Sequence, residues 1–151
     1  MAKPFYLFSP IYPLIAQQIL DDYQISDGIC ADIGTGAGYL GIELASITNL
    51  EMHFIDHNPE ALRETKNNVK ERELSNTVHF VEADVIALPY ENNFFDLVIS
   101  RGSLWFWKDQ VAGMREVYRV LKSGRIAMVG GGLGRYTPES MRQRLRGKGR
   151  E

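Results

Sequence analysis

Cysteine is scarce in this sequence. Among 151 residues only Cys30 occurs, inside an apolar run. A single cysteine excludes a disulfide framework, a thiolate metal cluster and an internal redox pair, and it predicts a reducing, cytoplasmic setting. Histidine is scarce too, and His53, His57 and His79 are too scattered along the chain to predict a set of metal ligands. We therefore expect no metal site.

The sequence also has no large excess of positive or negative charge and no long apolar run. The formal net charge is -2, from 17 basic and 19 acidic residues, so no broad electrostatic field would attract nucleic acid or an anionic membrane. No stretch approaches the roughly 20 apolar residues that span a bilayer. Residues 1–10 lack the features of a signal peptide. The sequence predicts a soluble protein that binds neither nucleic acid nor membrane.

Short apolar segments alternate with helical patterns along the chain. Hydrophobic residues make up 44% of the sequence, enough for the core of one domain over residues 1–151. The alternation is typical of β-α-β units, so it predicts a doubly wound α/β fold with a parallel sheet. The expected strands are Ile29–Ile33, Met52–Asp56, Val78–Ala83, Phe95–Ser100 and Arg125–Val129.

Helices are expected before and between the first strands. The first covers residues 9–23 and the second ends near Ile47. A third reaches about Leu74, with Asn58 as its N-cap and Pro59 at the first helical position.

The C-terminal part holds two further helical patterns. Asp109–Leu121 is clearly amphipathic. A last helix begins near Thr137 and is expected to dissolve into the basic residues 142–151, which we interpret as a frayed, solvated end. Residues 28–132 are thus the expected core and residues 133–151 a tail.

Aspartates occur at the ends of the first three strands. Asp32, Asp56 and Asp84 lie at or next to those ends. Right-handed crossovers place the C-terminal ends of parallel strands along one edge, where open α/β folds bind ligands. We expect the three carboxylates to meet on one solvent-facing rim.

A glycine-rich segment, residues 34–38, connects the first strand to the next helix. Glycines at this place let a ligand approach the backbone at a helix N-terminus. A carboxylate at the end of the second strand, here Asp56, can accept hydrogen bonds from both hydroxyls of a ribose. Together the two features predict an adenosine-containing ligand.

Four segments resemble the motifs of class I S-adenosylmethionine-dependent methyltransferases, in the order and spacing of the small-molecule (type 11-like) branch. The resemblance spans about residues 9–132 and implies S-adenosyl-L-methionine as the cofactor and a small or medium-sized molecule as the methyl acceptor. It also implies a Rossmann-like, mostly parallel sheet of strand order 3-2-1-4-5. The matching segments are Ala31–Gly38, Ala83–Tyr90, Phe95–Ser100 and Glu116–Lys122.

The resemblance assigns one set of residues to the methionine part of the cofactor. Gly34, Thr35 and Gly36 would approach it, with the carboxylate of Asp32 beneath their loop. Ser100 lies where the fourth strand of the family touches the same side. No general base can be assigned, so the catalytic residues stay open.

A second set would hold the adenosine part. The resemblance implies that Asp56 binds the ribose and that His57 packs on the adenine face. Asp84 would accept a hydrogen bond from the adenine amino group, and the backbone of Val85 would meet the ring nitrogen.

Several of these signals have simpler interpretations. Gly36, Gly38 and Gly41 also match the dinucleotide fingerprint, so an NAD-dependent oxidoreductase is the main alternative. A module that binds the cofactor without chemistry is the other. Asp84 could form only an Asx-turn, and for Asp96 we favour a structural role at the entry of its strand.

Aromatic residues after the fourth strand suggest a substrate mouth. Trp105, Phe106 and Trp107 follow that strand closely and could overhang the entry of a methyl acceptor, with Tyr12 closing it from the N-terminal segment. The alternative is that they pack under the N-terminal helix as a satellite core.

The sequence departs from the family at its end. Members commonly continue into two more strands, and nothing after Gly132 is strand-like, so we expect a truncated chain. The fifth strand would then have an unpaired outer edge, which invites pairing with another chain. A homodimer through this edge, or marginal stability, is the expectation.

Overall fold

The fold is built on one five-stranded sheet. The computed structural model describes residues 10–149, and within them all four strand pairs are parallel, in the order β3-β2-β1-β4-β5. This order confirms the expected Rossmann-like α/β fold. The strands are β1 (Ile29–Ile33), β2 (Glu51–Asp56), β3 (Val78–Glu82), β4 (Phe95–Arg101) and β5 (Leu121–Gly130).

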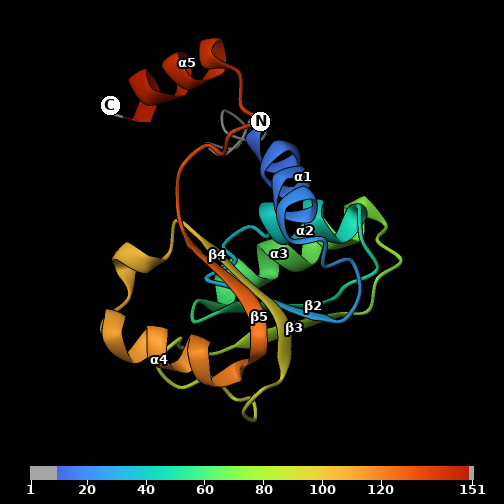
Figure 1. The fold of residues 1–151 in the computed structure, drawn as a ribbon, viewed down its shortest axis with the longest axis vertical. Helices are drawn as coiled ribbons and strands as arrows, with labels where there is room; N and C mark the ends of the chain where they lie inside the picture. The colour runs from blue at the N-terminus through green and yellow to red at the C-terminus, as the bar shows by residue number, and fades with distance from the viewer. Residues whose placement is uncertain (1–9, 150–151) are drawn as a thin grey trace.

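Helices lie on both faces of this sheet (Figure 1). Helices α1, α2 and α3 cover one face, and α4 covers the other together with the loop 83–94. A 3-10 turn, η2, precedes α4. The bounds are α1 (Ile11–Tyr23), α2 (Tyr39–Ser46), α3 (Pro59–Arg72), η2 (Leu104–Phe106), α4 (Gln110–Val120) and α5 (Glu139–Gly149).

Two apolar cores result from the alternation of side chains along the strands. Cys30 points into the core shared with α1, α2 and α3, whereas its neighbour Ala31 points into the core beneath α4. Val117 and Val120 of α4 seal the second core. The central strands are therefore buried on both faces, as parallel sheets require.

The helix starts follow the expected capping chemistry. The side chain of Asn58 accepts a hydrogen bond from Glu60 N at 2.9 Å, and Pro59 occupies the first helical position of α3. Asp109 accepts from Ala112 N at 3.0 Å at the start of α4. The first helix begins at Ile11 with Pro10 as its N-cap, and Ser9, where the expected helix begins, lies outside the described residues.

Two expectations for the C-terminal part are wrong. Strand β5 starts at Leu121, before the expected Arg125, because its pairing with β4 continues across a register shift near Gly124, whose φ is +77°. The tail does not dissolve after residue 141 but continues as α5. Leu145 is buried in the first core, and this burial favours the helix where composition alone predicted fraying.

Helix α5 leaves the outer edge of β5 open. Figure 1 shows α5 near the start of α1, at the far end of the molecule from α4. The segment before it is tied to α1 by the ion pair of Arg135 with Asp22 and by the hydrogen bond of Tyr136 to Asp21. Within residues 10–149, no helix has the length and apolar character needed to cross a bilayer.

Candidate cofactor site

The candidate site lies at the C-terminal ends of β1 and β2. Asp32 pairs in register with Phe54, and Asp56 ends β2 beside Glu82 of β3. Both aspartates are buried rather than solvent-facing, so the expected open rim is wrong for them. Two carboxylates removed from water at adjacent strand ends require partners, and these partners define the site.

The glycine loop turns sharply over these strand ends. Gly34, Gly36 and Gly38 all adopt positive φ, at +67°, +59° and +83°, a conformation that side-chain-bearing residues rarely adopt. Gly34 N donates to Ile55 O at 2.8 Å, which anchors the loop on β2. A Cβ on Gly36 would meet nothing within 4 Å, whereas a Cβ on Gly34 would collide with Ser103 Oγ. Gly36 therefore faces open space where a ligand can approach.

Asp56 ties the loop to the second strand. Its Oδ2 accepts from Gly36 N and its Oδ1 accepts from Asn58 N, both at 2.9 Å. A carboxylate offers about four acceptor positions, so two remain for a ligand. His57 beside it is exposed, with Nδ1 3.7 Å from Asp56 Oδ1. Asp56 and His57, which the family resemblance assigns to adenosine, thus lie next to each other, and their contacts with the cofactor stay predictions.

Asp32 lies beneath the same loop with an unusual acidity. Thr35 Oγ1 donates to Asp32 Oδ2 at 2.7 Å. Burial raises the pKa of Asp32 to about 7, the charge of Asp56 adds to this effect, and the hydrogen bonds from Thr35 and Gly41 oppose it. Among the described residues Asp32 has no ion-pair partner, so a cationic ligand would favour its ionised form.

Tyr12 reaches this region from α1. Its ring lies 5.4 Å from the ring of Tyr39, and the Arg101 guanidinium lies 5.4 Å from the Tyr12 centroid. Burial raises the pKa of Tyr12, Arg101 lowers it and the charge of Asp32 raises it further. The structure therefore places Tyr12 near Asp32, at the expected methionine end. Sequence reasoning missed Tyr39 and Arg101, although Arg101 directly follows the expected fourth strand.

The side chains of three other residues assigned to the cofactor make contacts within the protein. Asp84 is exposed, and its Oδ1 accepts from Ile86 N at 3.2 Å, which is the simpler Asx-turn geometry. Val85 is buried in the second core. Ser100 is buried and donates its hydroxyl to Ile33 O at 2.7 Å. Cofactor contacts by these three residues stay predictions.

The three aromatic residues after β4 divide into two groups. Trp105 and Phe106 are 62% and 83% exposed, so they form no satellite core under α1. Trp107 is half-buried against the second core, and its Nε1 donates to Ser103 Oγ at 2.8 Å. Ser103, which the sequence analysis did not single out, therefore links Trp107 to the glycine loop.

Comparison with known proteins identifies the family of this chain. The family described as "methyltransferase domain" matches residues 30–124, more than half of the chain and the part that contains the glycine loop, Asp32 and Asp56. The chain belongs to this methyltransferase family. The class I, S-adenosylmethionine-dependent kind expected from the motifs is confirmed, and membership implies S-adenosylmethionine as the cofactor.

Similar proteins support the assignment to this family, and each matches a different share of the chain. A 2-methyl-6-phytyl-1,4-hydroquinone methyltransferase of Oryza sativa subsp. japonica is 37% identical over 98 residues, covering 64% of this chain and 28% of the relative. A candidate S-adenosyl-L-methionine-dependent methyltransferase of Methanococcus maripaludis is 37% identical with a TM-score of 0.88, covering 94% of this chain and 64% of the other. The [4+2]-cyclase SpnF is 26% identical with a TM-score of 0.72, covering 78% and 43%.

The methyltransferase domain thus spans less than a third of the rice relative it matches. Its site nevertheless fits the cofactor on its own geometry. Gly36 leaves free the space a ligand needs, Asp56 keeps acceptor capacity, and Asp32 lacks a positive partner among the described residues. A nucleoside with hydroxyls at one end and positive charge at the other matches these three properties.

Proposed function

We propose that this chain catalyses methyl transfer from S-adenosyl-L-methionine to a small or medium-sized molecule. The observation that carries the proposal is the pair of buried carboxylates, Asp32 and Asp56, joined by a glycine loop whose Gly36 faces open space. When bound, the cofactor supplies an activated methyl group on a sulfonium. The chain then needs mainly to position the reactants and exclude water.

The residues would divide this work along the site. Asp56 would hold the ribose hydroxyls while keeping the Gly36 and Asn58 amides in place. Asp32 would face the cationic methionine end, supported by Thr35. His57, exposed beside Asp56, is free to pack on a flat base. These roles rest on position and charge.

An apolar, aromatic acceptor suits the surface beside this site. Trp105 and Phe106 expose their rings directly after β4, and aromatic rings bind flat apolar molecules by stacking. The rice relative is named for a phytylated hydroquinone, which has this chemistry. Trp105 also packs against Gly131, so the acceptor would lie between the end of β4 and the end of β5.

Binding and turnover experiments separate this proposal from its rivals. Calorimetric titration with S-adenosylhomocysteine and with NADH tests the cofactor, and we expect binding of the first alone. Turnover with labelled S-adenosylmethionine and a panel of alkylated hydroquinones tests the reaction. NADH binding without S-adenosylhomocysteine binding would replace the proposal with an oxidoreductase.

A second function deserves a test because the fold also occurs in a [4+2]-cyclase. The chain could bind the cofactor and carry out no methyl transfer. Tight S-adenosylhomocysteine binding together with no labelled product from the acceptor panel or from a pooled metabolite extract would favour this alternative.

Self-association through β5 is a further part of the proposal. Within residues 10–149, β5 is the outer strand on its side and α5 does not cover it. Pairing of two such edges would satisfy their backbone groups. Sedimentation at several concentrations should show a monomer–dimer equilibrium, and a monomer at every concentration would contradict it.

A cytoplasmic location is proposed on the state of the only cysteine. Cys30 is a free, buried thiol, which suits a reducing compartment. Fractionation of cells expressing the natural protein should place it with cytoplasmic markers.

A further inference from the structure

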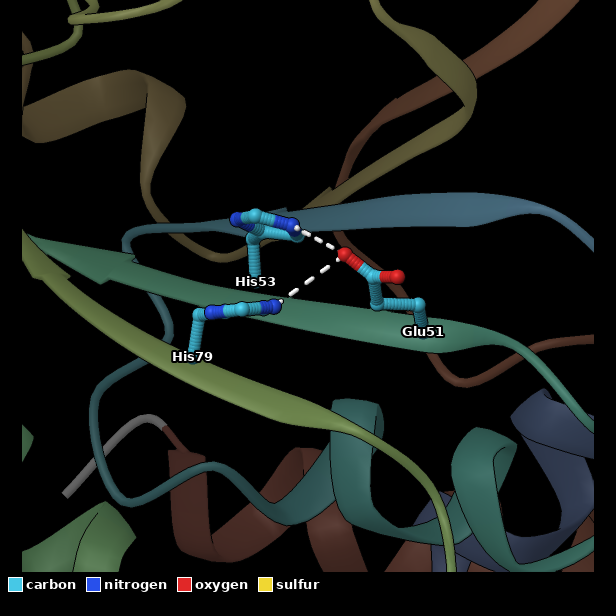
Figure 2. A group of neighbouring side chains, drawn as sticks. All are labelled: Glu51, His53 and His79. Carbon is cyan, nitrogen blue, oxygen red and sulfur yellow. Dashed lines mark hydrogen bonds and ion pairs between the residues drawn. The ribbon is translucent and has the colours of Figure 1, made fainter.

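A cluster of two histidines and a glutamate lies outside the cofactor site. Glu51 and His53 are two residues apart on β2 and therefore share one face of the sheet. The parallel register pairs His53 with His79 of β3, which places the two imidazoles side by side. Figure 2 shows both rings directing one nitrogen toward the Glu51 carboxylate.

The potential ligand atoms are already close together. Glu51 Oε2 lies 3.1 Å from His53 Nε2 and 3.1 Å from His79 Nε2. All three atoms fall within 4.8 Å of one another. Tetrahedral zinc with bonds of ~2.0–2.2 Å holds its ligand atoms about 3.3 Å apart. Two of the three separations therefore match, and the exposed His79 can turn to adjust the third.

A further contact orients the buried ligand. His53 Nδ1 lies 2.9 Å from Tyr90 Oη, and the rings of Phe94 and Phe95 pack edge-on against the same imidazole. Metal-binding histidines commonly use their second ring nitrogen in this way, which fixes the tautomer. The Tyr90 hydroxyl can either donate to Nδ1 or accept a hydrogen bond from it, so it can serve both tautomers of His53.

We propose that Glu51, His53 and His79 bind one Zn²⁺ ion or a similar divalent transition metal. The donor set of two imidazole nitrogens and one carboxylate oxygen is typical of zinc sites with an open position. The His79 side chain is 44% exposed, so water can reach that position. Without metal, Glu51 Oε2 accepts hydrogen bonds from Nε2 of both histidines. With metal on Nε2, the ring proton of His53 would reside on Nδ1 and form a hydrogen bond to Tyr90 Oη.

This site lies far from the cofactor. Glu51 and Asp56 are at opposite ends of β2, roughly 16 Å apart along an extended strand. The metal would join β2 to β3 and hold the loop that carries Tyr90, so we expect it to stabilise the sheet edge rather than take part in methyl transfer.

Zinc titration of the untagged protein tests the proposal directly. Calorimetry with ZnCl₂ should give one equivalent. The surface variants Glu51→Gln and His79→Gln should bind at least tenfold more weakly, and Tyr90→Phe about tenfold more weakly through loss of the orienting contact. His57→Gln is the matched control, because this exposed histidine lies at the other end of β2, and it should bind zinc like the wild type.

Nitrogen NMR of the histidine rings adds a readout that does not depend on affinity. Zinc should shift Nε2 of His53 and His79 and leave His57 unchanged, while the S-adenosylhomocysteine affinity stays constant. Zinc should also raise the melting temperature of the wild type and not that of His79→Gln. Equal zinc binding by wild type and His79→Gln, or a shift at His57 alone, would overturn the proposal without affecting the proposed methyl transfer.

Discussion

Two buried aspartates at opposite ends of the sheet have opposite electrostatic surroundings. Asp96, at the start of β4, accepts from Ile29 N at 2.9 Å and lies 3.1 Å from Lys122 Nζ and 3.5 Å from Arg125 Nε. Burial opposes its ionisation, but these partners outweigh burial and hold the pKa of Asp96 below its ordinary value. This contact confirms the structural role favoured for Asp96.

Asp32 lacks such compensation. Burial raises its pKa to about 7, and among the described residues no cation pairs with it. A structural carboxylate therefore obtains its countercharge from the chain, as Asp96 does. A carboxylate without one is costly to the fold and available to a positive ligand. The comparison indicates which end of the sheet is functional.

The largest expected effect is opposite stability changes in two Asp→Asn variants at pH 8. The raised pKa of Asp32 means that its contribution to stability is lost as pH rises from about 4 to about 7, at about 1.4 kcal/mol per pKa unit. Asp32→Asn should therefore raise the free energy of unfolding, by on the order of 2 to 4 kcal/mol. Asp96→Asn should lower it by about 1 kcal/mol.

Urea unfolding at several pH values checks both variants. The lowered pKa of Asp96 means that its contribution is present above about pH 4 and is lost as pH falls further. The Asp96→Asn difference should thus vanish in acid, whereas the Asp32→Asn difference should vanish as pH falls from 7 toward 4. Equal destabilisation by both variants at pH 8 would contradict the claim that Asp32 and Asp96 have opposite electrostatic surroundings.

Removal of the other buried carboxylate should weaken cofactor binding. Asp56→Ala should lose about 2 to 3 kcal/mol of S-adenosylhomocysteine affinity, the scale of hydrogen bonds to charged groups. It should also reduce stability, because Gly36 N and Asn58 N lose their acceptor. Calorimetry measures the first effect and thermal unfolding the second.

Glu82→Ala is the matched control for Asp56. Glu82 ends the neighbouring strand in register with Asp56 but is exposed. Its removal should leave cofactor affinity unchanged, and an equal loss in both variants would mean that general negative charge, not the Asp56 position, binds the ligand.

A smaller effect should link cofactor binding to protonation of Asp32. A positive ligand favours the ionised carboxylate, so S-adenosylmethionine affinity should rise with pH up to about 7, by at most about tenfold per unit. Near pH 6 binding should release a proton, which calorimetry in buffers of different ionisation enthalpy detects. Asp32→Asn should remove the slope, and a slope that persists in this variant would assign it to another group.

The smallest effects concern the two tryptophans. Trp107 donates to Ser103, which lies against Gly34, so its fluorescence should respond to the cofactor. The exposed Trp105 should respond to the acceptor instead. Single Trp→Phe variants separate the two signals. Two flat titrations, with binding confirmed by calorimetry, would remove both residues from the site.

Much of the fold was predictable because it depends on neighbours in sequence. The alternation of strands and helices, the Asn58 cap and the glycine turn all follow from dihedral preferences and short-range hydrogen bonds. The C-terminal part was harder to predict, because α5 depends on Leu145 reaching a core made by distant residues. The amino-acid composition of the tail does not reveal a contact with residues so distant in the sequence.

The sequence alone determined the fold class, the strand order through its family motifs, and the place of Asp32 and Asp56 at the strand ends. Tertiary structure alone decided that both aspartates are buried and that the Ser100 hydroxyl donates a hydrogen bond to Ile33 O. It also brought His53 and His79 together, although they are 26 positions apart in the chain and the sequence indicated no metal site. Local patterns set where a side chain lies on its element, but strand register and burial set what it meets and how it is charged.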